Sequence, residues 1–249
     1  KGKIYMPEKL SSSEQQALQD IAYNYKTIEE TIAKAALQSG RNRQDITFLA
    51  ATKTVDADRI NYAVSLGLSH IGENRAQELL AKYESYDLTR ASLQFIGHLQ
   101  TNKVRQIVGK VDMIQSVDSE KLAGEIAKHS LANGITTDIL IEVNIGNEVS
   151  KSGVAPQGLE ELLFRIGTMR GISVKGLMAI PPICDKKGEI CKYFCAMYKL
   201  FIDMKAKKMD NVFMDYLSMG MSADYREAIL EGANMVRIGS SLFGPRLYI

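Results

Sequence analysis

The pattern of apolar and polar positions changes in character after the first 46 residues of the chain. Before that point, apolar side chains recur at the 3.6-residue spacing of one helix face, and Gly40 ends the series. Ser11 and Glu14 have the spacing of a capping box, in which each side chain accepts a backbone N–H at the helix start. The pattern predicts a long amphipathic helix that covers the bottom or the flank of the remaining fold. Its apolar positions are Leu18, Ile21, Ala22, Tyr25, Ile28, Ile32 and Ala35.

From residue 47 onward, short apolar and β-branched runs alternate with stretches of helical periodicity. Several runs, such as 139–141, are almost continuously apolar, as in strands that are buried on both faces of a parallel sheet. The expected strands are 47–52, 70–72, 93–97, 113–117, 138–145, 174–180, 212–217 and 235–238. The clearest helical stretches are 57–66, 75–83, 119–133, 156–169 and 187–208.

This alternation predicts an α/β fold, a single (β/α)₈ TIM barrel with an additional N-terminal helix. Short connections and right-handed crossovers close such a series of strands and helices into a barrel. A doubly wound open sheet is the alternative, but it would be expected to carry a Gly-rich turn after the first strand, and 52–56 contains no glycine. We therefore expect one domain over 1–249, with a helical extension at 1–46 and the barrel at 47–249. The last strand is expected to end the series without a helix.

Lys53 is the most distinctive polar residue that follows a strand. Barrel active sites lie at the carboxyl ends of the strands, and Lys53 comes directly after the uncharged run 47–52. Its amine is therefore expected to leave the barrel core at the mouth. A desolvated lysine has a lowered pKa and can form a Schiff base with an aldehyde. A strand-end lysine that extends to solvent fits the position of Lys53 equally well.

Small residues follow the last two expected strands, where TIM barrels commonly bind phosphate with backbone N–H groups. The loop after the seventh strand contains Ser218, Met219, Met221 and Ser222, and the loop after the eighth contains Gly239 and Ser240. Gly/Ser loops are common in turns, so the evidence is their position in the series of strands. A Schiff-base lysine beside two such loops is the outline of a pyridoxal phosphate site.

Two further polar residues lie at strand ends. Arg237 comes two residues before Gly239 and is expected to contact the phosphate or the cofactor ring, or else to form an ion pair with Glu227 or Glu231. Against the pyridine nitrogen it would keep that nitrogen unprotonated. His98, after the third strand, is a candidate acid or base, but we favour a hydrogen-bonding role at the mouth.

Composition excludes several classes of protein. The 249 residues carry a net charge of +2, are 45% hydrophobic and are 24% charged, which is typical of a globular domain and not of a nucleic-acid-binding protein. No window approaches about 18 apolar residues without a charge, so we expect no membrane span. The first residues lack the apolar core of a secretory signal. These features lead us to expect a cytoplasmic protein.

The three cysteines, Cys184, Cys191 and Cys195, are too few for a disulfide framework, which indicates a reducing compartment. No histidine lies near them in the sequence, so we expect no metal site. Cys191 and Cys195 share a helical spacing with Phe194, Tyr198, Phe201 and Met204, which predicts an apolar face that packs in the core.

The motifs around these residues resemble those of the pyridoxal phosphate homeostasis protein family, whose fold is similar to the N-terminal barrel domain of alanine racemase. They are 51–54 (ATKT), 71–78 (IGENRAQE), 95–103 (FIGHLQTNK), 176–180 (GLMAI), 217–224 (LSMGMSAD) and 236–244 (VRIGSSLFG). Together they extend from the first expected strand almost to the C-terminus. Where this sequence has Ala51-Thr52-Lys53, the family more usually has Val-Ser-Lys.

The resemblance implies that Lys53 holds pyridoxal 5′-phosphate as a Schiff base and that Asn74 lines the pocket near the cofactor ring. It also implies that the 218–222 loop, with Gly239 and Ser240, holds the phosphate. Arg237 matches the arginine that the related racemases place against the pyridine nitrogen.

Members of this family are regarded as buffering and delivering the cofactor, with an influence on amino-acid and keto-acid balance and no established turnover. We therefore expect a monomeric cofactor carrier, with pyridoxal-phosphate-dependent apoenzymes as recipients. The alternatives are an amino-acid racemase of the alanine racemase type and a barrel enzyme that acts on a phosphorylated sugar. Alanine racemases receive a catalytic tyrosine from a second, β-rich domain, which is not expected in a chain that ends at Ile249. Tyr216 and Tyr225 are candidates for the opposing base by location alone.

Overall fold

Eight parallel strands form a closed barrel in the order of the sequence. The computed structural model describes residues 5, 11–148, 151–184 and 186–245. The strands are β1 (Thr47–Ala51), β2 (His70–Glu73), β3 (Ser92–Phe95), β4 (Met113–Val117), β5 (Thr137–Glu142), β6 (Ile172–Met178), β7 (Val212–Ser218) and β8 (Met235–Ile238). Hydrogen-bonded pairing of β1 with β8 closes the ring. The predicted (β/α)₈ barrel and each of its expected strands are confirmed.

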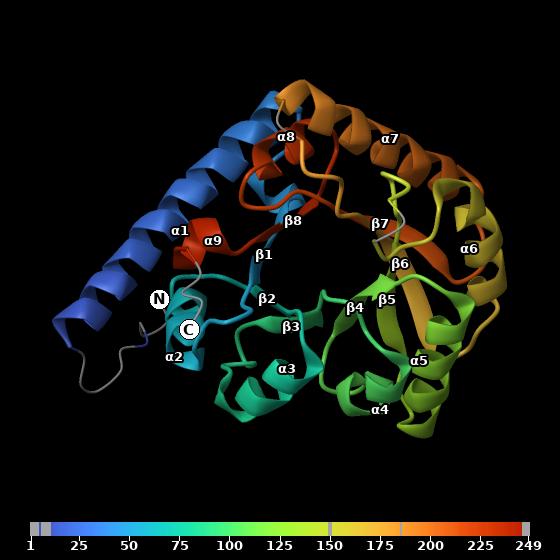
Figure 1. The fold of residues 1–249 in the computed structure, drawn as a ribbon, viewed down its shortest axis with the longest axis horizontal. Coiled ribbons are helices and arrows are strands. Elements are labelled where there is room, and N and C mark those ends of the chain that lie inside the picture. Colours follow the sequence, from blue (N-terminus) through green and yellow to red (C-terminus); the bar gives the residue numbers. More distant parts are fainter. Residues whose placement is uncertain (1–4, 6–10, 149–150, 185, 246–249) are drawn as a thin grey trace.

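Helices surround the barrel, as Figure 1 shows. They are α2 (Ala57–Ser65), α3 (Ala76–Lys82), α4 (Val104–Ile107), α5 (Glu120–Ala132), α6 (Leu159–Gly167), α7 (Lys187–Ala206), α8 (Tyr225–Leu230) and α9 (Ser240–Phe243). The predicted helix over 156–169 is divided, because Pro156–Gly158 form a 3₁₀ turn ahead of α6. The expectation that no helix follows the last strand is wrong, since α9 begins directly after β8. None of the helices within the described residues is long and apolar enough to cross a membrane.

The N-terminal helix α1 (Ser12–Gln38) lies along the flank of the barrel beside α8 and α9 (Figure 1). The capping box of Ser11 and Glu14 is present at its start, as predicted. Asn24 ties the helix to α9 by donating to the carbonyl oxygen of Leu242 at 3.1 Å. Arg41, just after the helix, donates to the carbonyl oxygen of Ala233 at 2.8 Å. The flank is therefore the part of the barrel that α1 covers.

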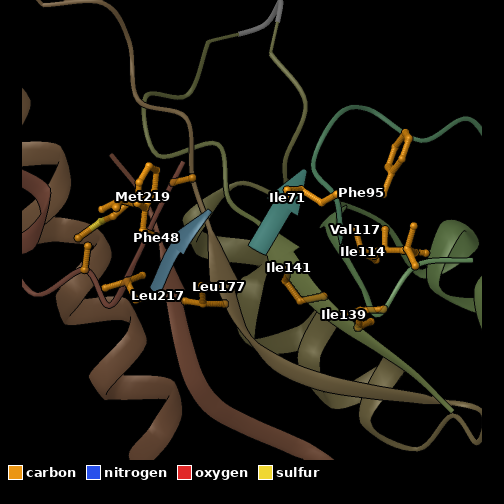
Figure 2. Packing of buried hydrophobic residues seen from close by; sticks show 14 of the residues in the cluster. Phe48, Ile71, Phe95, Ile114, Val117, Ile139, Ile141, Leu177, Leu217 and Met219 are labelled. Carbon is orange, nitrogen blue, oxygen red and sulfur yellow. The ribbon is translucent and has the colours of Figure 1, made fainter. Parts of the chain in front are cut away.

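Most of the core lies between the strands and the helices. Alternate side chains of each strand point outward into this layer, because successive residues of a strand face opposite sides. Figure 2 shows Phe48, Leu217 and Met219 in one part of the layer and Ile114 with Val117 in another. The burial of each such side chain contributes about 1.5–3 kcal/mol to stability.

A smaller apolar group lies inside the barrel. Met113, Leu140 and Met178 pack together there, with Ile180 and Tyr216 at the edge of the group. Leu140 alternates with the outward-facing residues Ile139 and Ile141, which identifies the group as the inward-facing side of the strands. The same alternation carries polar residues toward the barrel axis near the strand ends.

Helix α7 has the predicted apolar face only in part. Phe194, Phe201 and Met204 are buried, but Tyr198 is 41% exposed. The ring of Tyr198 lies against Gly232, where a Cβ atom would come within 2.2 Å of it. The cysteines Cys184, Cys191 and Cys195 are half-buried. Cys184 and Cys191 pack against the main core, so the predicted core packing is confirmed for Cys191.

Candidate cofactor site at the barrel mouth

A pocket of about 180 Å³ lies where β1 and β8 end. It is lined by Ala51, Lys53, Thr54, Val55, Arg59, Gly239, Ser240, Phe243, Gly244 and Pro245. The two strands are paired through Ala50 and Ile238, so the residues that follow them lie next to each other at the barrel mouth. The closed barrel thus brings the predicted lysine to the loop predicted to bind phosphate.

Alternation along β1 determines the direction of Lys53. Phe48 and Ala50 belong to the outer layer, so Ala51 and, two residues later, Lys53 face the barrel axis. Lys53 is half-buried in the pocket wall. Thr54, which follows it, has a φ of +64°, a left-handed conformation that is uncommon for threonine. The chain therefore turns sharply immediately after the lysine.

Ser222 connects the two loops that were predicted to bind phosphate. Its Oγ accepts the backbone N–H groups of Gly239 and Ser241, each at 3.2 Å. The hydroxyl of Ser241 donates in return to the carbonyl oxygen of Ser222 at 3.2 Å. At Gly239 a Cβ atom would lie 3.1 Å from the carbonyl oxygen of Ala51, so a side chain there would narrow the pocket.

The other residues predicted in the first loop are placed differently. Strand β7 extends to Ser218, one residue further than expected, so Ser218 is part of the barrel wall. Met219 is fully buried in the outer layer, and its N–H donates to the carbonyl oxygen of Met235 at 3.1 Å. The N–H of Met221 donates to Asp224 Oδ1 at 2.6 Å. Of the loop residues that were predicted, Ser222 contacts the second loop.

Arg237 points into the barrel interior and is almost fully buried. Its Nη1 donates to Ser218 Oγ at 2.7 Å, and its Nη2 donates to the carbonyl oxygen of Ala179 at 2.9 Å. The alternative of an ion pair with Glu227 or Glu231 is wrong, because β8 turns this side chain inward, away from α8. Burial lowers the pKa of Arg237 to about 10, and the carboxylate of Glu142 opposes that shift.

Glu142 is a buried carboxyl group that the sequence pattern did not single out. It ends β5 and faces inward, because its neighbours Ile141 and Val143 belong to the outer layer. Burial raises its pKa to about 7, the charge of Asp118 adds to the shift, and Arg237 opposes it. The sequence signal for an inward-facing Glu142 was its position two residues after Leu140, because alternate residues of a strand face the same side. The barrel mouth therefore holds a carboxyl group with a pKa of about 7 and a buried guanidinium that interact electrostatically.

Asn74 directly follows β2, the strand that pairs with β1. Gly72 and Ala51 are register partners, and Asn74 and Lys53 each come two residues later. The Oδ1 atom of Asn74 is buried and has no hydrogen-bond partner. Such an oxygen is a ready acceptor for a ligand group, because a buried polar atom without a partner costs free energy. Its position agrees with the role that the family resemblance implies.

His98 is exposed and lines a neighbouring pocket of about 350 Å³ together with Asn74. Its Nδ1 lies 3.2 Å from Ser152 Oγ, so it connects the loop after β3 to the loop after β5. The expectation of a hydrogen-bonding role at the mouth is confirmed for this residue. Within the described part of the chain, no group of three His, Cys, Asp or Glu residues is arranged to hold a metal ion.

Comparisons with known proteins agree with this geometry. The family model of the alanine racemase N-terminal domain matches residues 17–246. The pyridoxal phosphate homeostasis protein of Aquifex aeolicus (strain VF5) is 43% identical over 219 residues, which are 88% of this chain and 95% of that protein. The Escherichia coli (strain K12) protein of the same name is 33% identical over 234 residues, 93% of this chain and 99% of that protein. The chain belongs to the pyridoxal phosphate homeostasis protein family.

Solved structures show the same relationship. PipY of Synechococcus elongatus PCC7942 with pyridoxal phosphate bound has a TM-score of 0.75 and 30% identity, and the match covers 86% of this chain and all (100%) of that chain. Alanine racemase from Corynebacterium glutamicum has a TM-score of 0.68 but only 13% identity, over 93% of this chain and 62% of that chain. The racemase therefore shares the barrel fold with this member of the pyridoxal phosphate homeostasis family.

Arg59 is a pocket residue of this family member that the sequence analysis missed. It lies on the first turns of α2, lines the pocket with Lys53, and forms an ion pair with Asp56 at 3.2 Å. The available signal was its short sequence separation from Lys53, since the first turn of a helix that follows a barrel strand stays close to the mouth. A larger pocket of about 810 Å³ lies elsewhere, beside α6 and Lys207, and it contains none of the predicted site residues.

Proposed function

We propose that this protein binds pyridoxal 5′-phosphate at the barrel mouth, with Lys53 joined to the cofactor aldehyde, and acts as a carrier of the cofactor. The observation that carries the proposal is the pocket in which Lys53 and the Gly239–Ser240 turn face each other. An amine beside a glycine-containing turn, which a ligand can approach closely, suits a ligand with both an aldehyde and a phosphate. The membership of the family supports the same ligand.

The residues at the mouth fit the separate groups of this cofactor. Gly239, Ser240 and Ser222 would hold the phosphate, since a glycine lets a ligand approach the backbone closely. The unpartnered Oδ1 of Asn74 suits a donor group of the cofactor. Arg237 would lie toward the pyridine nitrogen. When bound, the cofactor supplies an electrophilic aldehyde and an electron sink.

Arg237 would restrict the chemistry that a bound cofactor supports, but it does not separate a carrier from a racemase, because the related racemases place an arginine against the same nitrogen. A guanidinium remains protonated at neutral pH, and the pKa of Arg237 stays at about 10 even after burial. A permanent donor toward the pyridine nitrogen keeps that nitrogen unprotonated, which weakens electron withdrawal by the ring. Reactions that need a protonated pyridine ring as a strong electron sink are correspondingly disfavoured.

The positions of two tyrosines bear on the choice between carrier and racemase. Tyr216 packs against the apolar group inside the barrel, and Tyr225 packs against the main core. Among the described residues that line the pocket of Lys53, none is a tyrosine or a histidine. A two-base racemase needs a second base opposite the lysine, so the carrier role is the better fit. Racemase activity is the alternative.

The wider role proposed here is storage and delivery of pyridoxal phosphate to apoenzymes that require it. We propose that the protein works as a monomer in the cytoplasm, and sedimentation of the purified chain would test its oligomeric state.

An absorbance spectrum with and without borohydride reduction tests the binding proposal. We expect a visible band after addition of pyridoxal phosphate, and a reduced adduct that mass spectrometry locates on Lys53. Lys53→Ala should show neither. Absence of any adduct on the wild-type protein would contradict the proposed function. Loss of optical activity from an amino acid, abolished in Lys53→Ala, would support the racemase alternative.

A further inference from the structure

A network of charged groups lies behind Lys53, on the outer side of β1 and β2. Lys82, on α3, is at its centre, and its side chain is 14% exposed. The Nζ atom of Lys82 lies 2.5 Å from Glu73 Oε1 and 2.9 Å from Glu78 Oε1. It also donates to two backbone carbonyl oxygens, that of Thr52 at 3.1 Å and that of Val55 at 3.0 Å. One ammonium group therefore joins α3 to the end of β1.

Glu73 is the buried counter-charge of this network, and its side chain is 0% exposed. Its Oε1 accepts the hydroxyl groups of Thr52 and Tyr86, each at 2.7 Å, in addition to Lys82. The position of the carboxylate is thus determined by three donors. Burial and this carboxylate together raise the pKa of Tyr86, which keeps its hydroxyl protonated as a donor.

The carbonyl groups that Lys82 binds lie on either side of Lys53 in the chain. Thr52 precedes Lys53, and Val55 follows it by two residues. Between them, the backbone N–H of Thr54 donates to Glu78, which holds the residue in its left-handed conformation. The backbone that carries Lys53 is therefore attached to α3 at three points.

We propose that Lys82 is a positioning residue that determines the direction in which Lys53 leaves β1 and so its reach toward the cofactor aldehyde. The inference rests on the proposed function, because it gives Lys82 a role only if Lys53 holds the ligand. Its physical basis is that covalent attachment requires the amine to lie within a small distance of the aldehyde. A shift of about 1 Å in the position of the amine therefore has a large effect on how readily the bond forms. A turn held only by its own backbone would not maintain that placement.

Two variants separate positioning from a general effect on stability. Lys82→Met leaves the Glu73 charge buried without its counter-charge, so this variant alone is expected to be less stable. In the double variant Glu73→Gln/Lys82→Met, no unpaired charge is buried, and the amide oxygen of the introduced glutamine can still accept from Thr52 and Tyr86. Lys207→Met is the matched control, because Lys207 pairs with Glu160 at 2.7 Å far from the mouth.

The first measurement is amide hydrogen exchange in the cofactor-free protein, at Thr54 and Val55 and at the core residue Ile141. The N–H of Val55 donates to the carbonyl oxygen of Thr52, so its exchange reports on the turn directly. We expect exchange at Thr54 and Val55 to be about tenfold faster in the double variant, with Ile141 unchanged. Unchanged exchange at the turn would overturn the proposal.

The second measurement is titration with pyridoxal phosphate, followed by borohydride trapping at Lys53. We expect the affinity of the folded double variant to fall about tenfold, with Lys207→Met like the wild type. A double variant with faster exchange but wild-type affinity would also overturn the proposal. If the wild-type protein itself gives no adduct, the proposed function fails, and the exchange data still decide whether Lys82 holds the turn.

Discussion

The hydroxyl of Ser222 accepts the backbone N–H of Gly239 at 3.2 Å and so joins the loop after β7 to the loop after β8. The contact draws together two turns that are separated by the whole of α8 and β8 in the sequence. Beside them lies Lys53, in the pocket that Gly239 lines. A ligand with an aldehyde and a phosphate would place the aldehyde beside Lys53 and the phosphate beside Gly239.

Gly239→Val tests the place of the phosphate. A Cβ atom at Gly239 would lie 3.1 Å from the carbonyl oxygen of Ala51, and the larger side chain would extend into the pocket. We expect the affinity for pyridoxal phosphate to fall about tenfold, whereas that for pyridoxal, which lacks the phosphate, changes little. Gly124→Ala, on α5 with nothing within 4 Å, is the control. Equal losses for both ligands would show that the phosphate lies elsewhere.

Lys53→Ala tests whether this residue serves binding or folding. Lys53 is half-buried at the end of a strand and contributes little to the apolar core. We expect complete loss of the borohydride adduct and a change in unfolding free energy within about 0.5 kcal/mol, as for most surface substitutions. Circular dichroism and urea titration measure the second effect. An unfolded variant would contradict the assignment.

Arg59→Gln tests the charge near the phosphate. Arg59 lines the pocket and its side chain is 38% exposed, so solvent screens its attraction for an anion. We expect a loss of pyridoxal phosphate affinity of about threefold to tenfold and a weaker dependence of binding on salt. Arg165→Gln is the control, because Arg165 forms its ion pairs on α5 and α6 instead. The same loss with pyridoxal would exclude a phosphate contact.

Lys82→Met tests the energetics of the network behind the mouth. Because Glu73 is fully buried, removal of Lys82 leaves an uncompensated charge, and we expect a loss of about 3–5 kcal/mol in unfolding free energy. Addition of Glu73→Gln should recover most of this loss, which urea unfolding of the two variants would measure. No difference between the single and double variants would show that the charge of Glu73 is not the cause.

Glu142→Gln tests the pH dependence of stability. The pKa of Glu142 is raised to about 7 from 4.5, so the folded state binds more protons than the unfolded state between these values. Stability therefore falls as the pH rises through this window, by up to about 3 kcal/mol from this group. The glutamine variant should gain stability relative to the wild type at pH values above the window, but not below it. Urea unfolding on both sides of the window measures this, and an equal effect on both sides would contradict the raised pKa.

Local periodicity was enough to predict the barrel and the position of Lys53. A continuously apolar strand removes its side chains from water only when both of its faces are buried. A lysine at the end of such a strand must leave the core at the mouth. The order of the strands then places the Gly239–Ser240 turn next to β1, because a closed barrel pairs its last strand with its first. These conclusions need only the alternation of side chains along each strand and the closure of the sheet.

Other parts of the site depend on contacts that no local pattern contains. The end of β7 lies at Ser218 rather than one residue earlier, and this turns Ser218 toward Arg237 and leaves Ser222 to join the loops. Likewise, Glu73 and Lys82 belong to one charged network only because α3 folds back across β2. Such pairs arise from strand register and from the choice of side-chain rotamers, which depend on packing between elements distant in the sequence. The sequence by itself determined that Lys53 and the Gly239–Ser240 turn reach the mouth. The tertiary structure decided which polar groups there bind one another, because strand register and helix packing bring particular donors and acceptors within hydrogen-bonding distance.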